Sequence, residues 1–485
     1  MATGVYSSHM SDSSTLLPLA AAAGGGFIDG LPASQLVAAG FTLLQRSAPV
    51  VRAMRGRRSA LLLNSGAPFL TGLAASDGHG AVLINPLAAP AEVAYQIADA
   101  DVGVVFTSRS MVSKLPLGVP YVLLDHAPRS ATTHFDGAET EVDLGSHVGL
   151  SVEVDSAAVG RDEEAAIVYT SAMAGRPLGA VLTHHNLLAN ARQTVAALGF
   201  TTGGHCLAVL PFAHLFGFTV TLIAPMISGS RVTTMSRFNP LVAVELLRTG
   251  GITEFFGVPA IFAAMLTAIE RSGGLLASPS LRLSGCGGAV LPLEIQERWF
   301  AATGLELRQG YGLTEASPVC LFNRVSLPNQ RGTLGTAFPG CDVSIRDPEL
   351  HTELSDGIAG EICIRGETIF RGYVRDGDSG LRLRDGWLGS GDRGVRDANG
   401  TVTFLGLIKD MFTRNGFNVY PKEIERVVSE MPAVRSVNCY AIPEPSREND
   451  VGIVVSGPVT EGDVRLWCES RLAVYKQPSV IQLVA

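Results

Sequence analysis

Two periods of apolar and polar residues alternate along the first half of the chain. Short apolar runs predict strands at residues 60–64, 80–87 and 102–108, and an amphipathic run at 91–100 predicts a helix between the last two. The same rhythm resumes further on, where Asn239, followed by proline, is expected to cap another helix. The pattern predicts an α/β fold whose large N-terminal domain has mostly parallel sheets covered by helices.

From about residue 335 the pattern changes to short strands separated by turn residues, which predicts a β-rich subdomain. A further unit has a strand-like segment at 412–420, an amphipathic helix at 421–430 and a last helix near 461–475. We interpret it as a small α+β domain that is truncated, because the chain stops at Ala485 without an obvious terminal element. The predicted division is a mobile or irregular arm at 1–50, a large domain at 51–408 and an incomplete small domain at 409–485.

Composition narrows the function classes. Apolar residues make up 46% and charged residues 17% of the 485 positions, which is typical of a globular protein, and no run of about eighteen apolar residues predicts a membrane span. The net charge of −8 comes with scattered basic residues, so a nucleic-acid partner is not expected. Seven cysteines without a C-x-x-C pair predict neither disulfides nor a zinc site, and a cytoplasmic location fits best.

The stretch from Tyr169 to Asn186 has the form of a phosphate-holding loop. An apolar strand is followed by small, hydroxylated and glycine residues and then by a predicted helix, an arrangement that presents backbone N–H groups to phosphate. Thr170 and Ser171 supply hydroxyls, and Gly175 allows close backbone approach. It is not a Walker loop, because G-x-x-x-x-G-K-[ST] is absent. An ordinary strand-to-helix connection is the alternative interpretation.

Together with other segments, this stretch resembles the adenylate-forming superfamily of acyl-CoA synthetases, peptide-synthetase adenylation domains and luciferases. The resemblance covers nearly the whole chain from about residue 60. The loop of that family has the approximate form YTSGTTGxPKG, which Thr170, Ser171, Gly175, Pro177 and Gly179 match. Further matches are the YGxTE-like segment 309–315, the GW-L-x-TGD-x-G-like segment 386–394, the segment 210–214 and the segment 416–425.

The resemblance implies a role for each of these segments. It places adenine on the face of Tyr311, the α-phosphate at the hydroxyl of Thr314, Mg²⁺ at the carboxylate of Glu315, and the ribose at Asp392. The residues that it assigns to ATP or AMP binding are Thr170, Ser171, Gly175, Gly287, Gly288, Ala289, Gly310, Tyr311, Gly312 and Asp392.

The same resemblance implies catalytic roles for His214, Thr314, Glu315 and Lys409. His214 would gate the acyl pocket, although a lone histidine beside phenylalanines is also common as a core residue. Lys409 would be the hinge about which the small domain rotates, and Gly416 and Phe417 would then face the pantetheine channel of CoA or of a carrier protein.

Three departures from the family pattern all concern ATP. Leu178 occupies the position of the loop lysine, Leu407 replaces the arginine two residues before the hinge, and the chain ends ahead of the terminal lysine. Charge-assisted contacts of this kind contribute on the order of 1.5–3 kcal/mol each, so their loss slows adenylation by several powers of ten. Partial compensation by Arg176 is the alternative, although a guanidinium two residues away has a different reach and geometry from the missing lysine.

Three hypotheses follow. The first is a ligase that converts a small carboxylic acid and ATP to an acyl-AMP and passes the acyl group to CoA or an acyl carrier protein. The second is an ATP-independent homologue acting on a preformed acyl thioester or adenylate, with His214 as base. The third is a catalytically silent binding protein. Oligomeric state stays open between monomer and homodimer.

Overall fold

The computed structural model describes residues 17–76, 79–145, 160–170, 177–375, 383–408, 411–444 and 446–484. In the first large sheet, nine described strands lie in the order β17, β16, β15, β14, β13, β11, β12, β1, β2. The strands from β15 to β1 pair in parallel and the outer pairs are antiparallel. Their bounds are Thr336–Ala337, Val319–Phe322, Leu307–Gly312, Leu283–Cys286, Glu254–Gly257, His205–Ala208, Arg231–Thr234, Phe27–Ile28 and Leu31–Pro32.

A second sheet has nine described strands in the order β20, β10, β9, β4, β3, β5, β6, β7, β8. Its centre, from β9 to β6, is parallel, and both edges are antiparallel. The expectation of mostly parallel sheets therefore holds for the sheet centres, while the sheets as a whole are mixed. The bounds are Gly372–Tyr373, Leu178–Thr183, Glu164–Thr170, Ala81–Leu83, Arg58–Leu62, Val102–Thr107, Tyr121–Leu123, Ser130–Phe135 and Ala138–Asp143.

Helices join the two sheets into one buried core. Helices α1, α2, α4, α6, α7 and the π-helical stretch η2 pack with residues of both sheets, whereas α8, α9 and α10 cover the outer part of the first sheet and α5 covers the second. Asn239 caps α8 as predicted, because its side chain accepts from the N–H groups of Leu241 and Val242. The helices are α1 (Leu17–Ala23), α2 (Ala33–Arg46), α3 (Ala48–Met54), α4 (Ala67–Ala75), α5 (Pro90–Asp99), η1 (Arg109–Lys114), α6 (His184–Leu198), η2 (Phe216–Ile223), α7 (Ala224–Ile227), α8 (Pro240–Thr249), α9 (Pro259–Arg271), α10 (Leu293–Thr303) and η3 (Thr314–Ala316).

The N-terminal segment differs from the expected mobile arm wherever the structure describes it. Helix α2 buries Leu36, Phe41 and Leu43 in the central core, and the backbone N–H of Leu17 donates to Nδ1 of His184 at 3.1 Å. The small residues that obscured any pattern in the sequence serve close packing instead, because they let α2 lie directly on α4.

The central stretch contains the predicted strand, β9, and the predicted helix, α6, and a further strand, β10, lies between them, while residues 171–176 fall outside the described residues. Strand β9 pairs antiparallel with β10, in which Leu178 faces Thr170, and α6 begins only after β10. The apolar run 178–183 was missed as a strand because it directly precedes a helix. Thr183 caps α6: its hydroxyl oxygen accepts from the N–H of Asn186, and the side-chain oxygen of Asn186 accepts from the N–H of Thr183.

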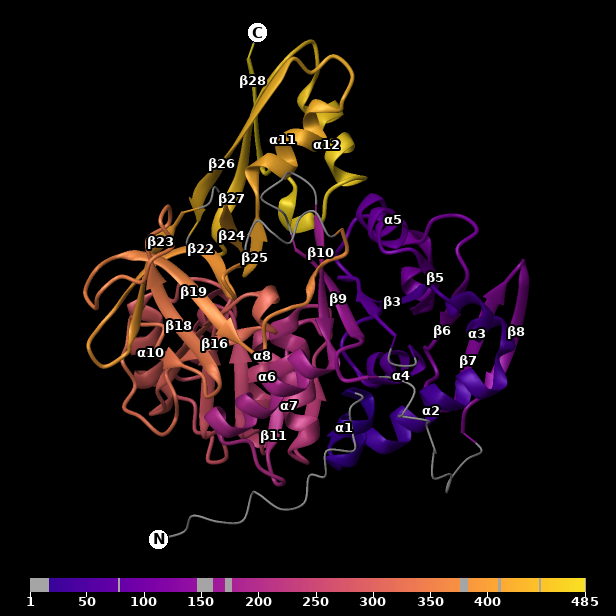
Figure 1. The fold of residues 1–485 in the computed structure, drawn as a ribbon, viewed down its shortest axis with the longest axis horizontal. Coiled ribbons are helices and arrows are strands. Elements are labelled where there is room, and N and C mark those ends of the chain that lie inside the picture. Colours follow the sequence, from indigo (N-terminus) through magenta and orange to yellow (C-terminus); the bar gives the residue numbers. More distant parts are fainter. Residues whose placement is uncertain are drawn as a thin grey trace.

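A β-rich subdomain and a small domain complete the chain, as predicted. The subdomain is an antiparallel sheet of β18 (Cys341–Arg346), β19 (Gly360–Gly366), β22 (Trp387–Arg396), β21 (Leu383–Arg384) and β23 (Val402–Leu407). The small domain, yellow in Figure 1, contains β24 (Phe412–Arg414), β25 (Phe417–Val419), α11 (Pro421–Ser429), β26 (Ser436–Glu444), β27 (Glu448–Ser456), α12 (Glu461–Glu469), η5 (Val474–Lys476) and β28 (Val480–Val484).

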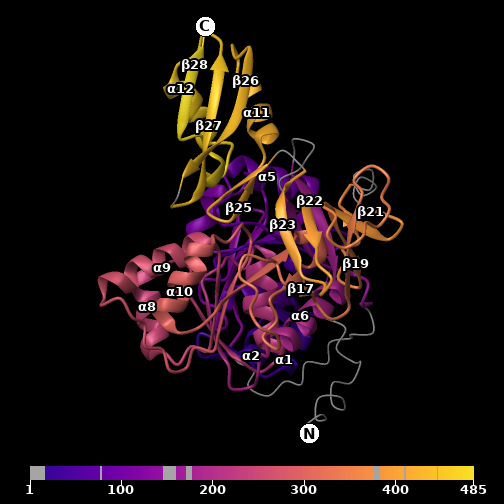
Figure 2. The same ribbon diagram turned by 90° about the vertical axis from the view of Figure 1, so that its left-hand side faces the viewer.

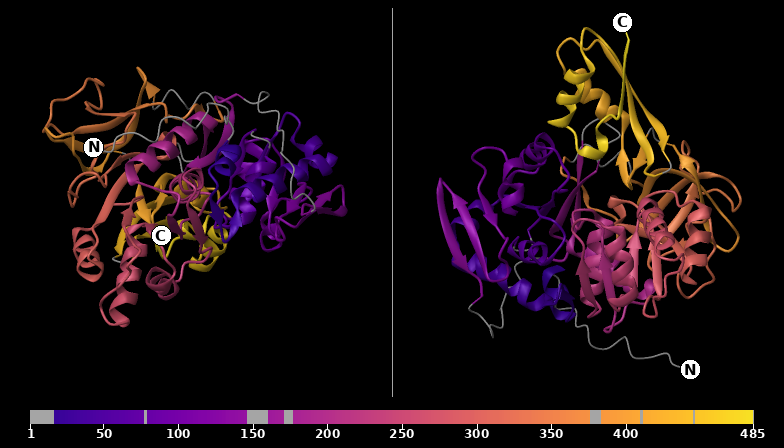
Figure 3. Two further views of the ribbon diagram at one scale, coloured as in Figure 1. Left: turned by 90° about the horizontal axis from the view of Figure 1, so that it is seen from below. Right: turned by 180° about the vertical axis from the view of Figure 1, so that it is seen from behind.

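The last described residues are not structureless, because β28 pairs in parallel with β27. Figure 2 shows the small domain at the end of the molecule opposite to α1 and α2, and Figure 3 shows it seated above the large domain in the view from behind. Among the described helices, none is both long and apolar enough to cross a bilayer.

Gly40 tests the N-terminal packing. A Cβ at this position would meet Thr71 O and would lie 2.7 Å from Ala74 Cβ, so Gly40→Ala should lower the free energy of unfolding by about 1–3 kcal/mol, seen as a lower melting temperature. Helix propensity alone predicts the opposite sign, a gain of about 1 kcal/mol. Gln35→Ala, on the exposed side of α2, is the matched control and should change little. A stabilised Gly40→Ala protein would contradict the packing.

Candidate active site

A cavity of about 360 Å³ is lined by residues of the large sheets, of the β-rich subdomain and of the small domain. Every described residue that the sequence assigned to the site lines this cavity except Phe417, which lies beside it. Three predicted residues, Ser171, Gly175 and Lys409, fall outside the described residues. Those that line the cavity are Thr170, His214, Gly287, Gly288, Ala289, Gly310, Tyr311, Gly312, Thr314, Glu315, Asp392 and Gly416.

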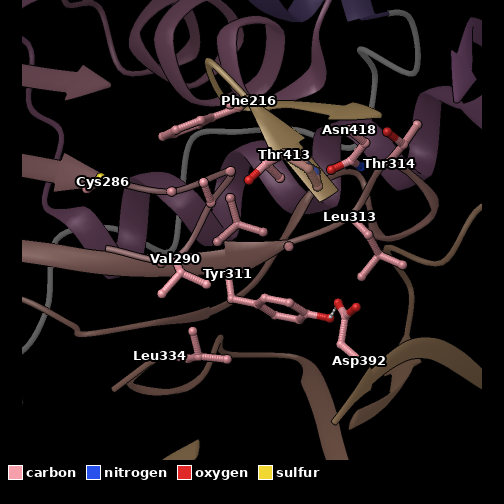
Figure 4. Close-up of a pocket in the computed structure, with 18 of the residues that line it drawn as sticks. Phe216, Cys286, Val290, Tyr311, Leu313, Thr314, Leu334, Asp392, Thr413 and Asn418 are labelled. Carbon is pink, nitrogen blue, oxygen red and sulfur yellow. Dashed lines mark hydrogen bonds between the residues drawn. The ribbon is translucent and has the colours of Figure 1, made fainter. Parts of the chain in front are cut away.

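Tyr311 and Asp392 form a hydrogen-bonded pair on one wall. The Tyr311 hydroxyl, from β15, donates to Oδ2 of Asp392, from β22, at 2.6 Å, and Figure 4 shows the ring and the carboxylate on the same side of the cavity. Burial, followed by the charge of Asp392, raises the pKa of the Tyr311 phenol well above its usual value, so the hydroxyl stays a donor. An aromatic face beside a fixed carboxylate can hold a base and a ribose.

Glu315 is held firmly from the neighbouring sheet. The Tyr373 hydroxyl donates to its Oε1 at 2.7 Å, and the N–H of Phe370 donates to its backbone carbonyl at 2.9 Å. Only 3% of Glu315 is exposed, whereas Thr314, one residue earlier, is less buried. A single carboxylate beside a hydroxyl can bind Mg²⁺ only together with phosphate oxygens from a ligand, and the described residues contain no cluster of three or more metal-ligating side chains.

His214 is a neutral hydrogen-bond donor rather than a base. Its Nδ1 accepts from the N–H of Phe216 at 3.2 Å, which assigns the remaining proton to Nε2. Burial lowers the pKa of His214 to about 4. The ring also meets Phe417 edge to face, with 6.4 Å between centroids, so the histidine contacts the small domain.

Part of the cavity lining is apolar, and the sequence motifs did not include most of these residues. Leu198 ends α6, while Phe216 and Val220 come from η2. The ring of Phe256, from β13, lies 6.4 Å from that of Phe216. A side chain at Gly287 would lie 3.4 Å from the Phe216 ring, so glycine there keeps the space open. The sequence offered one clue to these residues, because Phe216 lies two positions after His214, which the family resemblance had assigned to the acyl pocket.

The hairpin of β24 and β25 forms the wall contributed by the small domain. Its turn is Asn415-Gly416 with φ of 53° and 75°, a sequence suited to tight hairpins. A Cβ at Gly416 would lie 2.5 Å from Cγ1 of Val258, so only glycine allows this approach to the large domain. Thr413 and Asn418 of the hairpin line the same cavity as Thr314, and all three are labelled in Figure 4.

The electrostatics of the cavity favour a nucleoside more than a triphosphate. Among the described lining residues the only charged side chains are the acidic Glu315 and Asp392, and none is lysine or arginine. Leu407 faces Asp392 across β22 and β23 and lines the same wall. Cys286 also lines the cavity, but burial raises the pKa of its thiol, so it is not a ready nucleophile.

Comparison with known proteins shows the protein family to which the chain belongs. The model of the AMP-binding enzyme family matches residues 53–374, and the chain belongs to this family. It is 31% identical over 325 residues to a long-chain-fatty-acid–CoA ligase of Bacillus subtilis, covering 66% of this chain and 58% of the relative. It is 32% identical over 389 residues to a feruloyl-CoA synthase of Amycolatopsis sp, covering 76% and 78%. The chain thus spans little more than half the length of the Bacillus enzyme.

The fold has close counterparts among solved structures. The o-succinylbenzoate CoA synthetase of Bacillus subtilis superimposes with a TM-score of 0.79 at 22% identity, covering 95% of this chain and 92% of the other. At this identity the likeness is one of fold. It accounts for the two large mixed sheets and the small C-terminal α+β region together.

His214 predicts a pH-dependent stability. Because its folded pKa of about 4 lies below the unfolded value of about 6.5, its contribution is fully present above pH 6.5 and is lost as pH falls toward 4. We expect the wild type to lose on the order of 1–3 kcal/mol more than His214→Gln between pH 7 and pH 4.5. Urea unfolding of both proteins across this pH range measures the difference in the free energy of unfolding. Parallel pH profiles of the two proteins would contradict a lowered pKa of His214.

Proposed function

We propose that this protein is an acyl-activating ligase, which converts a carboxylic acid and ATP to an acyl-AMP and then transfers the acyl group to the thiol of CoA or of a carrier protein. One observation carries the proposal. Tyr311, Thr314 and Asp392 of the large domain share a single cavity with the Gly416 hairpin of the small domain. Residues suited to a nucleotide and an acceptor-side hairpin thus face the same space.

The chain's own residues orient the reactants. The Tyr311 ring would support the adenine, Asp392 would accept hydrogen bonds from the ribose, and Thr314 would donate to the α-phosphate. Glu315, fixed by Tyr373, would bind Mg²⁺, which supplies charge neutralisation at the phosphates. The apolar walls exclude water from the mixed anhydride, and exclusion of water favours transfer over hydrolysis.

The acyl group is best accommodated as an uncharged aliphatic or aryl group. Leu198, Phe216, Val220 and Phe256 contribute apolar side chains to the cavity lining. An unpaired carboxylate buried there would keep its full desolvation penalty.

A second candidate function is acyl transfer from a preformed thioester or adenylate without ATP. Leu178, Leu407 and the lack of a lysine or arginine among the described lining residues favour it. The hydrogen bond and the lowered pKa of His214 argue against this histidine as the base of such a reaction. An acceptor thiol would have to arrive ionised or lose its proton to water.

Several sequence predictions remain proposals. They are the hinge at Lys409, the division into 51–408 and 409–485, a cytoplasmic location, and an acyl carrier protein whose thiol accepts the acyl group. A catalytically silent binding protein would retain the cavity but would catalyse neither adenylate formation nor acyl transfer.

Leu178 is the position at which ATP use can be tested directly. Its side chain is partly exposed at the start of β10 and packs against the edge of the central core, so Leu178→Lys restores the family cation at some cost in packing. We expect ATP–pyrophosphate exchange in the presence of acid to rise about ten- to hundredfold, from a charge-assisted contact of about 1.5–3 kcal/mol. Leu178→Met is the control. If exchange is undetectable in both variants while an acyl thioester is consumed without ATP, the second candidate function replaces the first.

The acyl pocket predicts discrimination against dicarboxylic acids. Hexanoate and benzoate should be trapped as hydroxamates at least a hundredfold more efficiently than succinate or adipate, because the second carboxylate finds no cation. Val220→Arg should raise the relative kcat/KM for adipate, and Val220→Met should not. Equal use of mono- and dicarboxylic acids by the wild type would show that the pocket does not bind the acyl group.

A further inference from the structure

A buried ammonium group joins the small domain to the large one. Lys476, in η5, donates from Nζ to Glu92 Oε1 at 2.7 Å and to Glu423 Oε1 at 2.8 Å. Glu92 belongs to α5 of the large domain, and Glu423 to α11 of the small domain. Figure 1 shows α5 directly beside the small domain.

The three side chains are almost completely removed from water. Their exposed fractions are 5% for Lys476, 9% for Glu92 and 3% for Glu423. Burial opposes the charged form, but Glu423 and Glu92 outweigh it and raise the pKa of Lys476 well above its ordinary value. A buried charge that loses a partner is strongly unfavourable, so the contact is sensitive to the relative position of the two domains.

The two carboxylates differ in what they connect. Lys476 and Glu423 belong to the same small domain, so their bond can persist however that domain is oriented. The bond to Glu92 crosses between domains and exists only in an orientation like this one. Glu92 is itself fixed, because its Oε2 accepts from the N–H of Ala89 at 2.8 Å and caps α5.

This bridge is continuous with the hairpin that lines the cavity. Tyr475, next to Lys476, stacks on Phe417 with 4.4 Å between ring centroids. Phe417 follows Gly416 and meets His214 edge to face. Rigid aromatic contacts therefore connect the buried ammonium to the wall of the cavity contributed by the small domain.

We propose that Lys476 is a positioning residue for acyl transfer: by bonding Glu92 it holds the small domain so that the Gly416 hairpin faces the bound acyl group. The proposal rests on the proposed function for the reaction that it serves, and on the interdomain contact alone for the orientation. The bridge contributes to the second half-reaction and not to formation of the adenylate, which the family resemblance assigns to another orientation of the small domain.

Glu92→Gln is the informative variant. The amide keeps an oxygen that caps α5 but removes the charge that holds Lys476, and the Lys476–Glu423 pair within the small domain is left intact. Lys476→Met removes the ammonium itself. Glu423→Gln is the matched control, because it removes a carboxylate of the same cluster that does not cross between the domains.

Domain orientation is measured first, without reference to activity. The seven native cysteines are all buried, so spin labels can be placed at Leu117→Cys in the large domain and Leu466→Cys in the small domain, both of which are exposed. We expect one narrow distance distribution for the otherwise unchanged protein and for Glu423→Gln. Glu92→Gln and Lys476→Met should broaden or shift it. Unchanged distributions in both variants would overturn the proposal.

The two half-reactions are then measured separately on the full chain. Pyrophosphate exchange reports adenylation, and release of AMP from synthetic hexanoyl-AMP on addition of CoA reports transfer. We expect Glu92→Gln to lower kcat of transfer about ten- to hundredfold, with exchange changed less than threefold. Equal losses in both half-reactions, in step with a lower melting temperature, would mean a merely structural role and would also overturn the proposal. If the wild type is silent in both assays, the proposed function fails while altered distances in Glu92→Gln still support the orienting bridge.

Discussion

Docking of the small domain on the large one is the contact on which the site depends. The wall of the cavity is incomplete without the β24–β25 hairpin. The hairpin reaches the cavity because Gly416 packs against Val258 and the buried ammonium of Lys476 donates a hydrogen bond to Glu92. Both contacts are intolerant of displacement, one for steric and one for electrostatic reasons. A site assembled in this way would be complete only in a domain orientation like this one, as the proposed transfer reaction requires.

The charge distribution within the cavity is the second constraint. Two carboxylates, Glu315 and Asp392, face it without a described lysine or arginine, so the charge of any phosphate bound there must be neutralised by metal ions or by residues outside the described cavity wall. Leu407 lies where its backbone faces Asp392. The substitution thus lies on the wall that would hold the ribose, and apolar surface replaces a potential contact to the nucleotide.

Membership of the AMP-binding enzyme family and the geometry of the site support one another, but the first concerns the fold and the second concerns individual side chains. The family match covers residues 53–374, which include most of the two large sheets. The acyl specificity that we propose rests on Leu198, Phe216, Val220 and Phe256, which come from three separate elements. Shared fold does not determine those side chains, because function resides in the site that a fold carries.

The sequence by itself determined the local elements and the residues of the motifs. Strand and helix periods and the Asn239 cap are read from neighbours in the chain. The segment 412–420, expected as a single strand, instead turns back at Asn415-Gly416 as a hairpin. Only the tertiary structure decided the rest. The N-terminal helices looked patternless because small residues carry little periodicity, and β10 was obscured because strand and helix follow without a break. The Lys476–Glu92 bond joins residues 384 positions apart, and such a pairing depends on the docking of whole domains rather than on any local preference.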